Sequence, residues 1–502
     1  MHDYDVVIIG SGLGGLVCGA VLGMNGFKVC VLEKNRQVGG CLQTFSRDKT
    51  IIDTGVHYIG GLGEGQNLNK IFSYLGIMDK LKLVQLDRDG FDMICFGDDD
   101  ISYPLAQGYD NFKQQLLKSF PDEEPALNKY CDTIKHVCSR FPLYNLRNGD
   151  YREKEEVQHI DTKTFIESLT DNKRLQQVLA GNSMLYAGEG NKTPLYIHAL
   201  ITNSFIESAW KCVDGGSQIA KQLQRRITEN GGVVRRNCKV TAICADDEKA
   251  TNIELENGET VTAKYFISNL HPAQTIEMTK SKLFRNAYRS RMKSLENTAG
   301  TFLLNIVLKK DTFPYLNHNY YYHRHNDAWE GVVHNNEAWP LTYALFVNAS
   351  SRHNEFADSL TIMTYMRDAD VAQWSGTFST DSHPSHRGED YELFKEQRAE
   401  LLLDVVAQKF PNIRECIHAY YVATPLTYRD YQGTADGSMY GIANDYRDPV
   451  KTFIAARTKI PNLFLTGQNL NLHGILGVTI SSLITCGELL NIDDLLEKIN
   501  AS

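Results

Sequence analysis

Apolar positions near the start of the chain follow the pattern of a buried strand, a helix and a second strand. Residues 4–9 form a continuous β-branched run, which is typical of a strand covered on both faces. A glycine-rich stretch follows, then a helical segment over residues 16–25 that stops at Gly26, and a second strand over residues 28–32. The pattern therefore predicts a βαβ unit of about thirty residues.

The turn between the first strand and the helix fits the spacing G-x-G-x-x-G, and an acid follows the second strand. The turn consists of Gly10, Ser11, Gly12, Leu13, Gly14 and Gly15. Gly10 allows the tight turn, Gly12 lets the backbone approach a pyrophosphate, and Gly15 permits close packing of helix on strand. Glu33 is placed to accept hydrogen bonds from ribose hydroxyls. We therefore expect a dinucleotide on this unit.

Two later stretches continue the α/β pattern. In mid-chain, an amphipathic helix over residues 219–229 precedes four predicted strands, and Asn257-Gly258 predicts a hairpin turn between the last two. These strands span residues 233–235, 239–244, 252–255 and 260–268. Near the far end, an apolar strand over residues 462–465 precedes Thr466-Gly467 and a glycine-rich helix start. The run 475–490 contains too many polar residues for a membrane span and predicts a buried helix.

Two insertions separate these stretches. The first, residues 70–205, is predicted to be mainly helical, with amphipathic segments over 111–120 and 123–140. The second is rich in strand formers and predicts a sheet, followed by a long loop over 371–390 and a helix over 391–409. Its predicted strands span residues 301–308, 320–322, 343–347 and 361–366.

Composition narrows the function classes. The chain has 502 residues, and 52 Lys and Arg against 61 Asp and Glu give a formal net charge of -9, which argues against a nucleic-acid partner. Its eleven cysteines form no C-x-x-C pair, so we expect no structural zinc and a reducing compartment. With no basic leader before the first strand, we expect no secretory signal and a cytoplasmic protein.

Five histidines in the second insertion are candidate metal ligands: His318, His323, His325, His334 and His353. His323 and His325 lie two positions apart, on one face of a predicted strand, which is possible ligand geometry. No Cys or acid completes a recognisable ligand spacing, so we predict no metal site.

Two further motifs identify the dinucleotide by resemblance. GGCLQTF at residues 39–45 and DTGVHYIG at residues 53–60 resemble the phytoene desaturase and retinol saturase family of FAD-dependent oxidoreductases. Thr466-Gly467-Gln468-Asn469 is similar to the second FAD motif of that family, with Asn469 where the family commonly has Asp. Cys41 stands where the family often has Arg, and this fits its saturase branch.

The resemblance implies the fold and the cofactor site. The fold is α/β, with a Rossmann-type FAD-binding domain of the amine-oxidase and phytoene-desaturase type and an inserted α+β substrate domain. The FAD domain is assembled from residues 1–70, 206–272 and 456–502, and the substrate domain from 71–205 and 273–455. Besides the turn residues 10–15 and Glu33, the implied FAD contacts are Lys34, Gly39, Gly40, Cys41, Thr44, Val240, Gly467, Asn469, Gly474, Gly477 and Val478.

The implied reaction is hydride transfer between flavin and a carbon–carbon double bond of a hydrophobic isoprenoid or polyene. Saturation also needs a proton, and the candidate donors or orienting groups are His57, Tyr58, Tyr428 and Tyr440. His57 is favoured because an imidazole titrates near the working pH. One G-x-G-x-x-G leaves no second domain for a nicotinamide, so the electrons come from NAD(P)H bound transiently at the flavin or from a separate carrier.

Two alternatives stay open. On the same fold, a carotenoid desaturase or isomerase, or an amine-oxidase-like enzyme, would run different chemistry. In another class, a prenyl-binding protein like the GDP-dissociation inhibitors would bind no flavin, although Glu33, Gly39-Gly40 and Thr466-Gly467 argue against it. The apolar substrate also predicts peripheral contact with a membrane, through an apolar surface because the net charge opposes anionic lipid.

Overall fold

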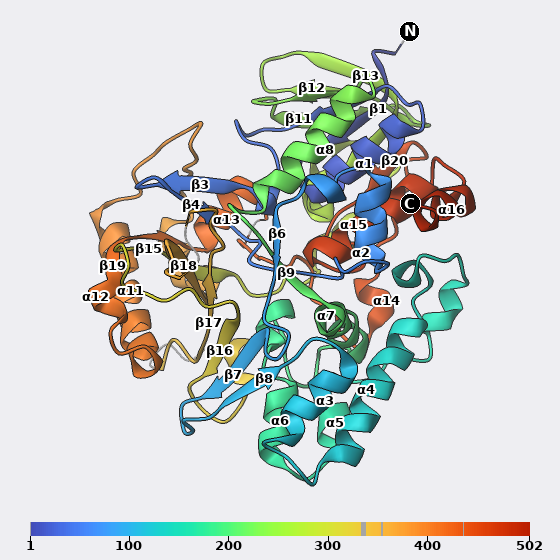
Figure 1. Ribbon diagram of the computed structural model, residues 1–502. Coiled ribbons are helices and arrows are strands. Elements are labelled where there is room, and N and C mark those ends of the chain that lie inside the picture. Colours follow the sequence, from blue (N-terminus) through green and yellow to red (C-terminus); the bar gives the residue numbers. More distant parts are fainter. Residues whose placement is uncertain (1, 333–337, 353–354, 435) are drawn as a thin grey trace.

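Two large sheets organise the chain (Figure 1). The computed structural model describes residues 2–332, 338–352, 355–434 and 436–502. The first sheet has eight strands. In order they are β10 (Val233–Arg235), β2 (Val29–Leu32), β1 (Tyr4–Ile9), β13 (Thr260–Ser268), β12 (Ala250–Leu255), β11 (Val240–Ala245) and β14 (Thr279–Lys280), with β20 (Leu463–Leu465) beside β13.

The parallel part of this sheet is built from segments far apart in sequence. β1 lies between β2 and β13, and β13 also pairs in parallel with β20. Three helices pack beside one another, with α1 (Leu13–Met24) in contact with both α8 (Ser217–Glu229) and α15 (Gly474–Gly487). β1 and β2 are buried on both faces, as their unbroken apolar runs predict. The predicted βαβ unit is therefore confirmed, although its helix begins at Leu13 rather than at residue 16.

The second sheet has seven strands and carries the substrate side of the molecule. In order they are β19 (Ile417–Ala423), β15 (Thr301–Leu308), β18 (Ser359–Tyr365), β17 (Thr342–Val347), β16 (Asn319–His323), β7 (Asp92–Phe96) and β8 (Ser102–Leu105). All neighbours are antiparallel except β16 and β7. The four strands predicted in the second insertion are present, as β15, β16, β17 and β18.

Both faces of the second sheet are covered, and alternate residues of each strand enter different cores. On β17, Tyr343 and Leu345 join the apolar cluster that includes residues of α11 (Glu389–Lys409), whereas Phe346 joins the large cluster on the other side. This alternation places Phe346 on the face that looks toward the first sheet and its helices.

The first insertion forms a helical lobe at the lower right of the view, beside the end of the second sheet that carries β7 and β8 (Figure 1). It contains α3 (Tyr109–Leu117), α4 (Glu124–Ser139), α5 (Thr162–Glu167), α6 (Lys173–Leu179) and α7 (Leu195–Glu207). The expectation of a mainly helical segment missed β7 and β8, which leave this insertion to complete the second sheet. β8 is only four residues long and contains Pro104, a residue depleted in strands, so its sequence does not mark it as one.

Short elements connect these parts. Residues 368–374 of the second insertion form a 3-10 helix, so the predicted loop over 371–390 is ordered at its start, and α11 begins at Glu389. The small sheets are β3 (Thr44–Arg47) with β4 (Thr50–Asp53), and β9 (Ala209–Cys212) between β5 (Ile59–Gly60) and β6 (Leu83–Gln85). The remaining α-helices are α2 (Asn67–Tyr74), α9 (Pro272–Met278), α10 (Asn286–Lys293), α12 (Ile413–Cys416), α13 (Pro425–Gln432), α14 (Pro449–Thr452) and α16 (Ile492–Asn500). The domain boundaries given above stay a prediction.

Candidate functional site

A cavity of about 1040 Å³ runs between the first sheet, its helices and the second sheet. This volume is at the upper end of the roughly 300–1,000 Å³ that small-molecule sites occupy. One end is walled by the turn after β1 and by Glu33, and the other by apolar side chains from α7, β17 and the start of α15. The cavity therefore joins a dinucleotide-like pocket to an apolar chamber.

Most of the predicted cofactor residues line this cavity. Those that do are Gly10, Gly12, Leu13, Gly14, Glu33, Lys34, Gly39, Gly40, Cys41, Val240, Gly467, Asn469, Gly474, Gly477 and Val478. Three do not line it: Ser11, Gly15 and Thr44. The Thr44 hydroxyl donates instead to Ser217 Oγ at 3.1 Å, beside the start of α8. The cofactor contacts assigned to these residues stay predictions.

Gly15 has a packing role. A Cβ at this position would lie 2.0 Å from the Gly10 carbonyl oxygen, so α1 can approach the end of β1 only with glycine here. This is the close helix–strand contact that the sequence predicts, and it explains why Gly15 does not face the cavity.

The Glu33 carboxylate is held by the turn itself. Its Oε2 accepts from the Ser11 backbone N–H at 3.0 Å and from Ser11 Oγ at 2.6 Å, and its Oε1 accepts from the Asn35 N–H at 2.8 Å. Glu33 is 6% exposed and lines the cavity. Ser11 therefore acts by fixing Glu33, which leaves the remaining lone pairs of the carboxylate for a ligand.

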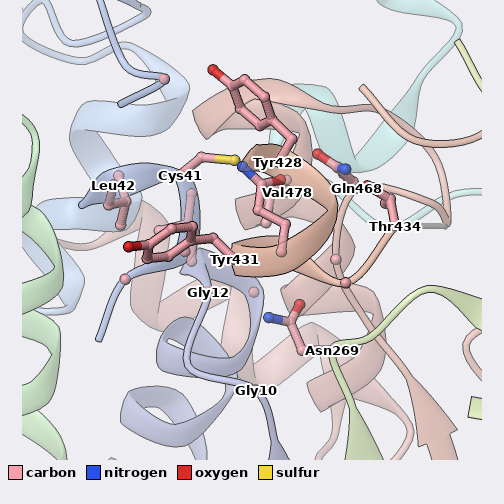
Figure 2. A pocket seen from close by; sticks show the side chains of 18 of the residues that line it. Gly10, Gly12, Cys41, Leu42, Asn269, Tyr428, Tyr431, Thr434, Gln468 and Val478 are labelled. Carbon is pink, nitrogen blue, oxygen red and sulfur yellow. The ribbon is translucent and has the colours of Figure 1, made fainter. Parts of the chain in front are cut away.

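The motif over residues 466–469 meets the turn over residues 10–15 at Asn269, a side chain that is not among the residues predicted from sequence. Asn269 follows β13 and lies beside Gly12, Gly14 and Gly467: a Cβ on Gly14 would lie 2.5 Å from Asn269 Oδ1, and one on Gly467 would lie 2.6 Å from the same oxygen. Figure 2 shows Asn269 beside the Gly10–Gly12 turn, with Val478 above it. In the sequence Asn269 only follows a predicted strand, and no motif marks it as part of the site.

Asn469 uses its amide oxygen within the protein. Its Oδ1 accepts from the Ile442 N–H at 3.1 Å, so one of the two lone pairs of this oxygen is used within the protein. Cys41 lies on the same side of the cavity as Tyr428 and Val478 (Figure 2), and burial raises the pKa of its thiol to about 11. At neutral pH Cys41 is therefore a thiol, not a nucleophilic thiolate.

The loop before α11 also reaches the cavity. Phe378, Thr380, Ser382 and His383 line it, and the loop is tied to α13 by Arg387, which pairs with the fully buried Asp430. The sequence suggested an ordinary polar loop here. Its Ser, Thr and His content carries no signal of a cavity wall.

The four candidate catalytic residues all line the cavity, but their polar atoms are used differently. Tyr428 donates to the Thr54 carbonyl at 2.8 Å and Tyr440 to the Met184 carbonyl at 2.9 Å. Tyr58 instead donates to the carboxylate of Asp92 at 2.8 Å. The hydroxyls of Tyr428 and Tyr440 are thus committed to backbone carbonyls, whereas that of Tyr58 touches a titratable group.

His57 is held as a neutral ring. It stacks on Phe346 with centroids 4.3 Å apart, and neither buried ring nitrogen has a hydrogen-bond partner among the residues that the structure describes. Burial, with a smaller contribution from the Lys211 ammonium, lowers the pKa of His57 to about 3. The argument for His57 as a proton donor required an imidazole that titrates near neutral pH, and this environment removes that argument.

The apolar end of the cavity is lined by side chains from the helical lobe, the second sheet and α15. They are Leu185, Leu200, Ile201, Phe205, Phe346, Met363, Met439, Leu472, Ile475 and Leu476. Few of these positions could be predicted as cavity-lining from sequence. Nearly all residues of α7 and β17 are buried, so no alternation of apolar and polar residues marks the side that faces the cavity.

The buried carboxyl of Asp53, the first residue of the DTGVHYIG motif, should make the stability of the protein depend on pH. Complete burial raises the pKa of its carboxyl from 3.8 to about 7, although the Gly216 N–H donates to it at 2.7 Å. A raised pKa means that the folded state holds the proton more tightly, so stability is lost as pH rises from about 4 through 7, by about 4 kcal/mol in all. Asp53→Asn keeps an acceptor and removes the charge.

We therefore expect the free energy of unfolding of Asp53→Asn, relative to the unsubstituted protein, to rise by about 2–3 kcal/mol between pH 5 and pH 8. Denaturant unfolding at the two pH values measures this. The exposed Asp110, changed to Asn, serves as the control. A difference for Asp53→Asn that is the same at both pH values would contradict the prediction.

The histidines proposed for the metal test do not converge. His323 is buried and its Nε2 lies 2.7 Å from the Gly181 carbonyl, whereas His325 lies beyond β16, is exposed and pairs with Glu330. The expectation that these two share a strand face was wrong, because β16 ends at His323. His334 and His353 lie outside the described residues. Within the described part of the chain, no group of three potential metal ligands is found.

Among the described helices, none is both long enough and apolar enough to cross a bilayer.

Comparisons with known proteins identify a family and several relatives. A family model described as flavin containing amine oxidoreductase matches residues 13–490. All-trans-retinol 13,14-reductase of Homo sapiens is 27% identical over 97% of this chain and 86% of its own length. Prolycopene isomerase 1 of an Oncidium hybrid cultivar is 28% identical over 53% of this chain and 48% of its own length.

Solved structures share the fold. A double mutant of putrescine oxidase superposes with a TM-score of 0.64 at 14% identity, covering 99% of both chains. Cyclohexylamine oxidase from Brevibacterium oxydans gives a TM-score of 0.61 at 12% identity, covering 99% of this chain and 100% of its own.

The chain belongs to the family of flavin-containing amine oxidoreductases. It is therefore a flavin-dependent oxidoreductase, and the resemblance to the retinol saturase and phytoene desaturase group is confirmed along with the predicted α/β fold class. The flavin-free alternative, a prenyl-binding protein, is set aside by this membership.

Proposed function

We propose that the protein uses FAD to reduce a carbon–carbon double bond of a hydrophobic polyene. The observation that carries the proposal is the single cavity, which joins the dinucleotide turn and Glu33 to an apolar chamber between α7 and β17. Two relatives that match 97% of this chain are named all-trans-retinol 13,14-reductase. An apolar chamber suits a polyene because its walls exclude water and bury the chain at little polar cost.

The residues present fit FAD. Gly12, Gly14 and Gly467 leave a cradle beside Asn269 that side chains would fill, and Glu33 stands at the ribose end. When bound, the flavin supplies hydride chemistry. For the ribityl chain and ring we propose the cavity-lining Gly39, Gly40, Gly474 and Gly477, where small residues permit close approach.

The chain's own side chains prepare the reaction. Leu200, Phe205 and Phe346 surround the apolar end and exclude water from it. His57, stacked on Phe346 and neutral, presents beside this end ring nitrogens that have no partner among the described residues. We propose that it contacts a polar group of the substrate rather than supplying a proton. The proton then comes from Tyr58, the candidate tyrosine whose hydroxyl is hydrogen-bonded to a carboxyl, that of Asp92.

Supply of electrons and substrate completes the proposal. The reductant is NAD(P)H acting transiently at the flavin, with a separate electron carrier as the alternative. The substrate is delivered at a membrane surface by apolar contact with an otherwise cytoplasmic protein. We also propose that residues 1–70, 206–272 and 456–502 form the FAD domain and the rest the substrate domain.

The test is anaerobic turnover of the purified holoprotein with all-trans polyenes, read by mass spectrometry. We expect a flavin absorption spectrum, bleaching on addition of NADPH, and a product two hydrogen atoms heavier than the substrate. A product of unchanged mass with altered retention would assign isomerisation, the activity named for the Oncidium relative. A product two hydrogen atoms lighter would assign desaturation. Bleaching by dithionite alone would assign the electron supply to a separate carrier.

A further inference from the structure

A buried hydrogen-bond network stands behind Tyr58, on the side away from the cavity. Tyr58 Oη lies 2.8 Å from Asp92 Oδ2 and 2.7 Å from Tyr321 Oη. The other oxygen of Asp92 accepts from Asn319 Nδ2 at 2.9 Å. Asp92 is fully buried, as is Tyr321. The network connects Tyr58, a residue of the cavity lining, to a carboxyl that no solvent reaches.

The second sheet sets this network. β16 and β7 are parallel, and their register puts Asn319 beside Asp92. Residues two apart on a strand share a face, so Tyr321 points the same way as Asn319 and meets Tyr58. These contacts follow from one strand pairing, and they join the first insertion, the second insertion and the segment that precedes β5.

The network can hold one extra proton without moving a heavy atom. With Asp92 ionised, Tyr58 donates to Asp92 and accepts from Tyr321. With Asp92 protonated, the carboxyl donates to Tyr58, and Tyr58 donates to Tyr321, because either atom of the Tyr58–Tyr321 contact can be the donor. Tyr428 and Tyr440 cannot be supplied with a proton in this way. Each donates to a backbone carbonyl, which carries no proton that it could give back.

We propose that Asp92 is the proton reservoir for Tyr58, which delivers the proton to the substrate carbon in the reduction proposed above. The inference rests on that proposed function. In the delivery step, hydride addition at one alkene carbon leaves the electron pair of the double bond on its neighbour. That pair forms a C–H bond with the Tyr58 proton, the O–H bond of Tyr58 breaks, and the Asp92 proton moves to the Tyr58 oxygen. Asp92 ends as a carboxylate.

The charges around Asp92 suit a group that titrates in the working range. Burial raises the pKa of Asp92 to about 7, against the lowering effect of hydrogen bonds from Asn319 and Tyr58. Asn182 also faces the carboxyl, and Lys211 of β9 is the charged group near it. Burial lowers the pKa of Lys211 itself to about 7, and its Nζ donates to the Val347 carbonyl at 2.9 Å. Turnover therefore falls as pH rises through about 7, because the reservoir empties.

The closing experiment compares Asp92→Asn with Asp161→Asn in the holoprotein. Asp161 is also a buried carboxyl, but it caps α5 through the Thr164 N–H and lies outside the cavity lining. We expect Asp92→Asn to lower kcat about a hundredfold with little change in KM, and to abolish the fall in kcat above pH 7. Asp161→Asn should keep the original kcat and pH profile. An Asp92→Asn enzyme that retains the original pH profile would overturn the inference.

A second readout needs no turnover. In the infrared spectrum of the substrate-free holoprotein, two protonated-carboxyl bands should titrate near pH 7, from Asp53 and Asp92, and Asp92→Asn should lose one of them. A band pattern that Asp92→Asn leaves unchanged would overturn the inference even if the enzyme is active. If the Asp92 band is present but no polyene is reduced, the proposed function fails, and delivery to carbon fails with it.

Tyr321→Phe provides a variant that leaves both Asp92 and Tyr58 in place. The variant removes the hydroxyl whose hydrogen bond with Tyr58 changes direction when Asp92 is protonated. We therefore expect a lower kcat with the pH dependence retained. A kcat equal to that of the unsubstituted enzyme would overturn the part assigned to Tyr321.

Discussion

Gly14→Ala is expected to weaken flavin binding by about ten- to a hundredfold. The added methyl would lie 2.5 Å from Asn269 Oδ1 and 3.1 Å from the Gly467 Cα atom. Asn269 can rotate, but the backbone at Gly467 must shift, and overpacking of this kind costs about 1–3 kcal/mol. The shift falls where the turn after β1 meets the turn after β20. Flavin fluorescence titration of the stripped protein measures the loss.

Gly23→Ala is the matched control for that change. Gly23 lies on the same helix, α1, and its added methyl would meet only Asn230 Cβ, at an ordinary 3.4 Å. We expect unchanged flavin affinity and a slightly more stable helix, since alanine is favoured over glycine in a helix interior. If Gly14→Ala binds flavin as tightly as Gly23→Ala, the junction of the two turns is not the cofactor cradle.

Arg387→Met is expected to lower the free energy of unfolding by about 3 kcal/mol and to release the loop over residues 375–388. Arg387 is 6% exposed and Asp430 is fully buried, so removing the guanidinium leaves a buried carboxylate short of one partner. Arg429 and the Ser379 N–H remain, which keeps the loss at the lower end of the usual range. Denaturant unfolding gives the energy, and limited proteolysis reports whether the loop is released.

Arg447→Met is the control that tests whether loss of any ion pair lowers the free energy of unfolding as much as loss of the Arg387 pair. Its pair with Asp445 is at the surface, with the arginine side chain 60% exposed, so we expect a change below about 1 kcal/mol. Equal destabilisation by both variants would mean that burial of the Arg387 pair carries no special weight.

The nucleotide end of the site could be predicted from sequence because its parts are adjacent there. The turn 10–15, the strands on either side and Glu33 fall within one βαβ unit, and each glycine has a local steric reason. The structure confirms that this unit is formed. It also shows that Ser11 and Gly15 serve the turn and the helix packing rather than the cavity.

The rest of the site depends on contacts between distant segments, which no local pattern records. In the sequence, Asn269 follows a predicted strand and Asp92 precedes a short apolar run, and neither position carries a motif. Their roles arise only when β13 meets β20 and when β7 pairs with β16. The same reason accounts for His57, since an ordinary imidazole pKa is a fair assumption until Phe346 and Lys211 enclose the ring.

The junction of Gly14 with Gly467 has a consequence for biosynthesis. These residues are separated by most of the chain, yet both form the floor of the same pocket. While the polypeptide is still emerging from the ribosome, β1, α1 and β2 can associate, but β13 lacks β20 and the floor is open. Long-range closure of this kind is slow and leaves apolar surface exposed meanwhile. We therefore expect a nascent chain to take up flavin only after β20 and the start of α15 have left the ribosome and closed the pocket floor.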